Sequence, residues 1–278
     1  MSVKKIIKRI IAFKKKKEII AIPQVTDEKK LLENKVAFIS GGSGGIGFAI
    51  AKTFLESGCK VIIAGTNEKK MAALISDLDE CHKANVKYVV LNLLDLSNLN
   101  HQVIDAATLF GRIDIFVNAA GTHTQDVDFW NMTSEEYDRI LNINLKASYF
   151  LCQAFGKYMK DHGVKGHVLI ISSSRGSEPA WSPYGLSKWG TNGMVKGLAQ
   201  VMIQYGIVVN GIAPGPTATD LLGVKEGDSI YTTENVIGRY AKPLEISAYA
   251  KLLVSDLGDM VVGEMLHISG GRGCFDIR

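Results

Sequence analysis

A tyrosine and a lysine stand four residues apart in the segment Ser182–Lys188 of this chain. Positions i and i+4 of a helix share one face, so Tyr184 and Lys188 would lie side by side if the segment is helical. An ammonium group stabilises a neighbouring phenolate, and we therefore expect Lys188 to lower the pKa of Tyr184. Such a phenol could exchange protons near neutral pH, which an ordinary tyrosine does poorly. The spacing alone also fits an ordinary surface helix. Motifs elsewhere in the chain are needed to distinguish a catalytic pair from such a helix.

Around this pair, short apolar runs alternate with helical segments. The runs that we expect to form strands lie at 36–39, 60–64, 88–91, 113–117, 168–171, 207–212 and 265–268. Helices are expected between them, among others at 46–57, 71–83 and 99–110. Near-continuous apolar strands separated by helices are typical of a parallel sheet that is covered on both faces. The pattern predicts an α/β protein with a Rossmann-like, doubly wound, seven-stranded parallel sheet and helices on both faces.

The bulk composition fits one enzyme-sized domain of an ordinary water-soluble protein. Among 278 residues, 46% are hydrophobic, and the four cysteines are scattered without a metal-ligand spacing. The histidines do not cluster either, so we expect no metal site. The net charge of +4 is concentrated in the first seventeen residues, which leaves no basic surface for nucleic acid. No apolar run is long enough to span a bilayer, and a cytoplasmic location is expected.

The first 33 residues read as an arm that precedes a single catalytic domain, residues 34–278. Apolar residues recur near a helical period between lysines; they are Val3, Ile6, Ile7, Ile10, Ile11 and Phe13. A basic amphipathic helix of this kind can lie on an anionic lipid surface, so residues 1–20 are predicted to make peripheral contact with the inner face of a membrane. A solubilising tail and an arm that packs on a neighbouring subunit are the alternatives.

A glycine-rich segment, residues 40–47, follows the first expected strand and opens the first expected helix. Glycine allows a tight turn and lets backbone N–H groups approach a pyrophosphate closely. The positive end of the helix dipole favours the same anion. In this position between strand and helix, the segment predicts a dinucleotide site.

At this point the chain resembles the short-chain dehydrogenase/reductase family, in its short single-domain branch. The matching segments cover about residues 34–273; they are 40–47, 95–97, 117–121, 144–148, 172–176, 214–219, 238–243 and 263–271. The resemblance implies that Asp95 pairs with adenine and that Thr219 lies beside the nicotinamide. The cofactor-binding residues implied are Gly41, Ser43, Gly45, Ile46, Gly47, Thr66, Asn67, Asp95, Leu96, Asn118, Ala119, Gly121, Tyr184, Lys188, Pro214, Gly215, Thr217 and Thr219.

The choice between NADP and NAD depends on the end of the second strand. An acidic residue there accepts hydrogen bonds from a free ribose 2′-hydroxyl and repels a 2′-phosphate. This chain has Gly65 at that position, followed by Thr66 and Asn67. The missing acid favours NADP, with Thr66, Asn67 and Lys69 as candidates to hold the phosphate, and NAD is the alternative.

The resemblance implies four catalytic residues. Tyr184 would be the general acid for carbonyl reduction or the general base for alcohol oxidation, and Lys188 would lower its pKa and bind the nicotinamide ribose. Ser173 would bind the substrate oxygen, although Ser172 and Ser174 are close alternatives. Asn144 would hold a water molecule that relays protons to Lys188.

These assignments predict an enzyme that interconverts a ketone and a secondary alcohol of small-molecule size. A sugar or nucleotide-sugar ketoreductase or epimerase-type enzyme, and a non-catalytic dinucleotide-binding module, are the alternatives. The resemblance also implies a homodimer or homotetramer. Residues 220–240 are expected to cover the substrate pocket. Side chains that could line the pocket or pack beside it are His123, Trp130, Arg175 and Trp181.

Overall fold

The computed structural model describes residues 27–225 and 227–275, and its strands form one parallel sheet. The strands are β1 (Val36–Ser40), β2 (Lys60–Gly65), β3 (Val86–Val90), β4 (Ile115–Asn118), β5 (His167–Ile171), β6 (Val208–Pro214) and β7 (Met265–Ile268). Their order is β3-β2-β1-β4-β5-β6-β7, and every adjacent pair is parallel. The predicted doubly wound, seven-stranded sheet is confirmed.

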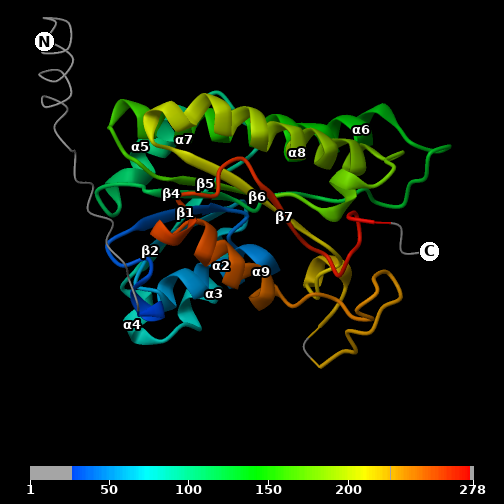
Figure 1. The fold of residues 1–278 in the computed structure, drawn as a ribbon, viewed down its shortest axis with the longest axis horizontal. Coiled ribbons are helices and arrows are strands. Elements are labelled where there is room, and N and C mark those ends of the chain that lie inside the picture. The colour runs from blue at the N-terminus through cyan, green and yellow to red at the C-terminus, as the bar shows by residue number, and fades with distance from the viewer. Residues whose placement is uncertain (1–26, 226, 276–278) are drawn as a thin grey trace, which may run out of the picture.

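Helices cover both faces of this sheet (Figure 1). Above it, as drawn, lie α5 (Leu99–Thr108), α7 (Ala147–Asp161) and α8 (Pro183–Met202), with α6 (Ser134–Leu141) beside them. Below it lie α2 (Gly45–Glu56), α3 (Glu68–Ser76), α4 (Glu80–Lys83) and α9 (Pro243–Leu253). The remaining short turns are 28–30, 142–146, 174–177, 203–205, 220–222 and 256–258.

The strands hold the two layers together because their side chains alternate between two apolar cores. Phe38 and Ile62 belong to the core beneath α5, α7 and α8, whereas Ile39 and Ile63 belong to the core beside α2, α3 and α9. In the first core the ring of Phe116 stacks on that of Phe155, with centroids 4.0 Å apart. A strand that is buried on both faces needs apolar residues at consecutive positions, which explains the continuous apolar runs of the sequence.

The structure differs from the sequence-based expectations at several places, and the third strand starts at Val86, two residues earlier than expected. The helix expected over 71–83 is two helices, because α3 ends at Ser76 and α4 starts at Glu80. The fourth strand starts two residues later than expected, at Ile115. The folded body also begins before residue 34, since Leu32 is fully buried in the core beside α2 and its N–H donates to the carbonyl of Ser57.

The membrane-contact arm predicted for residues 1–20 lies outside the described residues. Within 27–225 and 227–275, no helix combines the length and the apolar character needed to cross a bilayer. The same ranges contain no group of three or more His, Cys, Asp or Glu side chains that could hold a metal ion.

Strand β1 marks the point where the strand order reverses, because its neighbours are β2 on one side and β4 on the other. Chain segments that leave the carboxyl ends of β1 and β4 therefore diverge to opposite faces of the sheet. In open parallel sheets, ligands bind in the crevice at such a reversal. The fold thus places the ends of β1 and β4 where a dinucleotide would be expected.

Candidate active site

The turn after β1 packs so tightly against two other loops that side chains are excluded from it. Gly41 has a φ of +67°, and a Cβ added there would lie 2.7 Å from the carbonyl oxygen of Ala119, after β4. A Cβ on Gly45 would lie 2.6 Å from Cγ2 of Thr219, which follows β6. Only glycine relieves both the left-handed backbone and these contacts. The turn therefore brings the ends of three strands into one crevice.

This crevice holds a cavity of about 630 Å³. Helix α2 begins on its wall, and the N-cap Gly44 has no side chain to satisfy the first N–H groups of the helix. Free N–H groups at a helix N-terminus suit an anion, so the cradle fits the pyrophosphate of a dinucleotide. The cofactor-binding residues predicted from sequence that line this cavity are Gly41, Ser43, Gly45, Ile46, Gly47, Thr66, Ala119, Gly121 and Thr219.

Asp95 and Leu96, which the resemblance implies as adenine-side residues, do not line this cavity, and their assignment stays a prediction. The Asp95 carboxylate accepts hydrogen bonds from the backbone N–H and the hydroxyl of Ser97, at 3.1 and 2.6 Å, and these bonds lower its pKa. Asn92 and Leu93 line the cavity instead. They directly follow the end of β3, whereas Asp95 lies in the next turn. Their short distance from the strand end is the sequence signal that could have identified them as lining residues.

Two predicted cofactor ligands support the site from behind rather than lining it. The Asn118 amide accepts from the Ser40 hydroxyl at 2.7 Å and donates to the Ser148 hydroxyl at 2.8 Å. The Asn67 side chain caps α3 by accepting from the backbone N–H of Lys70. Beside Thr66, the side chain that reaches the cavity wall is Lys70, one position after the predicted Lys69.

A second cavity, of about 260 Å³, adjoins the first. Ile46, Thr219 and Leu221 line both cavities, so the two meet there. Predicted site residues on the wall of the second cavity are Ser173, Tyr184, Pro214, Gly215 and Thr217. Residues that the catalytic prediction did not include are also there; they are His123, Arg175, Leu222, Glu234, Tyr240 and Arg272. The arrangement suits a substrate whose reacting carbon faces the end of the dinucleotide cavity.

Helix α8 carries Tyr184 and Lys188 as predicted. The Ser182 hydroxyl accepts from the N–H of Gly185 and Pro183 occupies the first turn, so the helix begins just before Tyr184. Lys188 follows one turn later on the same side, with Nζ 5.7 Å from the centre of the Tyr184 ring. Lys188 is buried, and its Nζ donates to the carbonyl of Ile171 at 3.3 Å.

The pKa of Tyr184 departs from the expectation. Burial raises it, while Ser173, Arg175 and Arg272 act in the opposite direction. Desolvation of the phenolate outweighs these stabilising neighbours. Burial also lowers the pKa of Lys188, to about 8. The fold thus places the phenol of Tyr184 beside the buried ammonium group of Lys188, and burial holds the pKa of the phenol above its ordinary value.

Among the three consecutive serines after β5, Ser173 is the one positioned beside the phenol. The Ser172 hydroxyl is committed to the side chain of Asn192 at 2.5 Å. Ser173 starts the turn 174–177, where its hydroxyl accepts from the N–H of Arg175, and it interacts with the Tyr184 hydroxyl. This geometry supports the choice of Ser173 over its neighbours.

Asn144 lies in a π-helical turn, Asn142–Lys146, between α6 and α7. Its side-chain oxygen accepts from the N–H of Thr122 at 2.8 Å, and its amide donates to the carbonyl of Thr122 at 2.9 Å and to the hydroxyl of Ser187 at 3.3 Å. The side chain predicted to hold a water molecule is therefore engaged with protein groups. In this structure it fixes the loop that follows β4 against α8.

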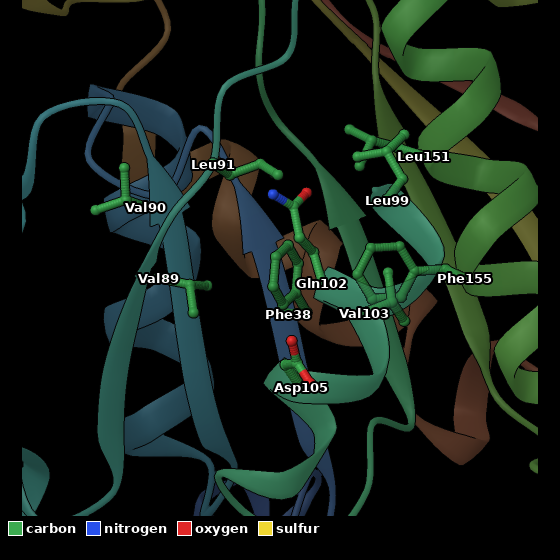
Figure 2. A pocket seen from close by; sticks show the side chains of 10 residues that line it. All are labelled: Phe38, Val89, Val90, Leu91, Leu99, Gln102, Val103, Asp105, Leu151 and Phe155. Atoms are coloured by element: carbon green, nitrogen blue, oxygen red, sulfur yellow. The ribbon is translucent and has the colours of Figure 1, made fainter. Parts of the chain in front are cut away.

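A third cavity, of about 160 Å³, lies away from these residues, between strands β1 and β3 and helices α5 and α7 (Figure 2). Its wall is mostly apolar, and Phe38, Val103 and Phe155 point toward one another there. None of the predicted catalytic or cofactor-binding residues lines it. This cavity is a gap in the packing of the first core and is separate from the active-site crevice.

Comparison with known proteins agrees with this architecture. The family model for short chain dehydrogenase matches residues 35–228. The chain belongs to the short-chain dehydrogenase family. A 3alpha-hydroxysteroid dehydrogenase of Mediterraneibacter gnavus is 34% identical over 248 residues, which cover 86% of this chain and 97% of that protein. The 3-oxoacyl-(acyl-carrier-protein) reductase FabG of Rickettsia bellii is 35% identical over 245 residues, with 86% and 97% covered.

A solved structure extends the comparison to three dimensions. A variant of ElxO with NADPH bound superimposes with a TM-score of 0.78 at 25% identity, covering 87% of this chain and 99% of that one. As a member of the short-chain dehydrogenase family, the chain is an NAD(P)-dependent oxidoreductase that acts on carbonyl or alcohol groups of small molecules.

Proposed function

We propose that this short-chain dehydrogenase interconverts a ketone and a secondary alcohol with NADP(H), and that Tyr184 exchanges the proton. The observation that carries this proposal is the position of Tyr184 and Ser173 on the wall of the smaller cavity, which shares Ile46, Thr219 and Leu221 with the dinucleotide cavity. A proton donor on this wall can reach the oxygen of a carbonyl whose carbon faces the nicotinamide.

In the reductive direction the protein supplies the proton and the orientation. The Ser173 hydroxyl binds the substrate oxygen, and the Tyr184 hydroxyl donates its proton to that oxygen as negative charge develops on it. The buried ammonium of Lys188, one helical turn away, stabilises the phenolate that remains. When bound, the dinucleotide supplies or accepts the hydride. In the oxidative direction Tyr184 is the base that removes the alcohol proton.

The residues around the end of β2 support NADP over NAD. Gly65, Thr66 and Lys70 line the cavity there, and the acidic residue in the described lining, Asp220, follows β6 instead. A Cβ on Gly65 would lie 3.2 Å from Oγ of Ser43, so that hydroxyl is also close. A hydroxyl and an ammonium group suit a 2′-phosphate, whereas a free 2′-hydroxyl usually pairs with a carboxylate. The similar ElxO structure contains NADPH, which agrees with this preference.

The alternatives are less well supported by the same residues. A non-catalytic dinucleotide-binding module has no need of Ser173 and Tyr184 on one cavity wall, or of a buried Lys188 one turn after Tyr184 on the same helix. A sugar ketoreductase or epimerase-type enzyme requires the same proton donor but a different substrate. Steroid and acyl-thioester substrates are named for the two relatives, and both are ketones or alcohols that this chemistry would accept.

A substrate screen with both dinucleotides tests the proposal. Purified protein is incubated with NADPH or NADH and with keto-steroids, 3-oxoacyl thioesters and keto-sugars, and nicotinamide absorbance is followed. We expect turnover of at least one ketone, with a higher kcat/KM for NADPH than for NADH. Dinucleotide binding without turnover of any carbonyl or alcohol would favour the non-catalytic module.

A further proposal concerns oligomeric assembly. Members of this family typically form oligomers, and α7 and α8 expose large apolar side chains that a second copy could cover; they include Tyr149, Phe150 and Trp189. A homodimer or homotetramer is therefore proposed.

For residues 1–20, attachment to an anionic membrane surface is proposed on the sequence pattern alone.

A further inference from the structure

His123 lies in the loop after β4 and stacks on the ring of Tyr184. The two ring centroids are 3.8 Å apart, with an angle of 23° between the planes. His123 also lines the smaller cavity. Its ring therefore covers one face of the phenol at the point where substrate would bind. The catalytic scheme above assigns no role to this histidine.

The loop that carries His123 is held in place on both sides. Arg139 of α6 donates from Nη2 to the carbonyl of His123 at 2.8 Å and from Nη1 to Oγ1 of Thr122 at 3.1 Å. Glu136 fixes Arg139 through two hydrogen bonds, at 2.6 and 2.8 Å. Asn144 binds both the N–H and the carbonyl of Thr122. With its backbone anchored in this way, the imidazole ring has a defined place against Tyr184.

The stacked ring is uncharged near neutral pH. Burial, Lys188 and Arg175 lower the pKa of His123 to about 4. The charged groups that act on Tyr184 are Lys188 on its own helix, Arg175 after β5 and Arg272 near the C-terminus. A neutral ring adds no charge to this set. Replacing His123 therefore changes packing and hydration around Tyr184 without removing a charge.

We propose that His123 is a positioning residue, whose stacked ring fixes the plane of the Tyr184 phenol and keeps water from its face, so that the hydroxyl stays beside Ser173. This inference rests on the proposed function, since it matters only if Tyr184 exchanges the proton. This role differs from a hydrogen-bonding role because the face of the imidazole ring, rather than its nitrogen atoms, makes the contact with Tyr184. An aromatic ring without nitrogen should then replace it.

The test compares His123→Ala with His123→Phe. Loss of an aromatic stack is worth a factor of about two to ten, so we expect kcat to fall by that factor in His123→Ala and to be restored in His123→Phe. The Kd for NADPH should stay within about two-fold in both. Water admitted beside Tyr184 should lower its pKa, because burial is what raises it. The rise of tyrosinate absorbance and of alcohol oxidation with pH should therefore begin at lower pH in His123→Ala only.

A second histidine–tyrosine pair gives the matched control. His162 packs on Tyr158 at the end of α7, with ring centroids 4.4 Å apart, away from both cavities. His162→Ala should leave kcat and the pH profile unchanged. Tyr184→Phe, measured alongside, identifies the Tyr184 contribution to the absorbance titration and tests the proposed function separately.

The possible outcomes distinguish failure of the His123 role from failure of the proposed function. An unchanged kcat and titration in His123→Ala, with Tyr184→Phe inactive, overturns the role of His123 but leaves the proposed function intact. The role is also overturned if His123→Phe is as impaired as His123→Ala, or if His123→Ala loses NADPH binding, since the histidine would then act through its nitrogen atoms or support the fold. Full activity of Tyr184→Phe would overturn the proposed function itself.

Discussion

Replacing Lys188 by methionine should make the protein more stable while abolishing its activity. Lys188 is buried, and within the described residues the only hydrogen bond of its ammonium group is the 3.3 Å contact to the carbonyl of Ile171. Burial lowers its pKa from 10.5 to about 8. At about 1.36 kcal/mol per pKa unit, desolvation of this charged ammonium group destabilises the folded protein by about 3 kcal/mol at pH 7. Methionine has a similar length and no charge to desolvate.

The sign of the pH dependence follows from the direction of this shift. Below about pH 8 both the folded and the unfolded chain bind the Lys188 proton, and the full cost is present. As the pH rises from about 8 to 10.5, the folded chain releases the Lys188 proton before the unfolded chain does. The free energy of unfolding of the wild-type protein therefore rises relative to that of the variant. The advantage of Lys188→Met should therefore fall from about 3 kcal/mol at pH 7 to about 1 kcal/mol near pH 9.5.

Urea denaturation followed by circular dichroism, in the absence of dinucleotide, measures this difference. Lys196→Met, at an exposed position two turns further along α8, is the control and should change stability by no more than about 0.5 kcal/mol. A Lys188→Met variant that is less stable than wild type at pH 7 would refute the reasoning. So would an advantage that does not shrink as the pH rises.

Three further predictions follow from other parts of the chain. Arg272 lines the smaller cavity and forms ion pairs with Glu178 and with Glu234, which lines the same cavity. Arg272→Ala should lower the free energy of unfolding by about 1–3 kcal/mol in urea denaturation and raise the KM for substrate, and an unchanged KM would show that these ion pairs do not shape the substrate site. Lys70→Ala should raise the Kd for NADPH about five- to ten-fold by fluorescence titration while leaving that for NADH unchanged; equal losses would remove Lys70 from phosphate binding. Deleting residues 1–20 should abolish salt-sensitive sedimentation with anionic vesicles, and equal sedimentation of the truncated protein would dispose of the membrane arm.

The sequence predicted the sheet because each strand is buried on both faces and so leaves a continuous apolar run. The glycine turn was equally visible, since contacts between strand ends exclude a Cβ from Gly41 and Gly45 whatever else the chain does. The Tyr184–Lys188 pair was predictable because it depends only on helical spacing. In each case the residue types and their spacing along the chain were enough for the prediction.

Other parts of the site depend on contacts between distant segments and could not be read from spacing. The pKa of Tyr184 follows from how deeply α8 is buried, which is a property of the whole fold. Asn92 lines the cavity and Asp95 does not, and this difference depends on where β3 ends in the fold. The stacking of His123 on Tyr184 depends on the hydrogen bond from Arg139 to the carbonyl of His123, and no pattern of neighbouring residues predicts that bond.

The central claim, that the phenol of Tyr184 exchanges the substrate proton, is tested most directly by Tyr184→Phe, with kcat and the Kd for NADPH measured on the same preparation. Removing the hydroxyl leaves the ring, its stack with His123 and the dinucleotide cavity in place. The account predicts a loss of kcat of about 100-fold or more with the Kd for NADPH unchanged. A variant that turns over substrate as fast as the wild-type protein would contradict it.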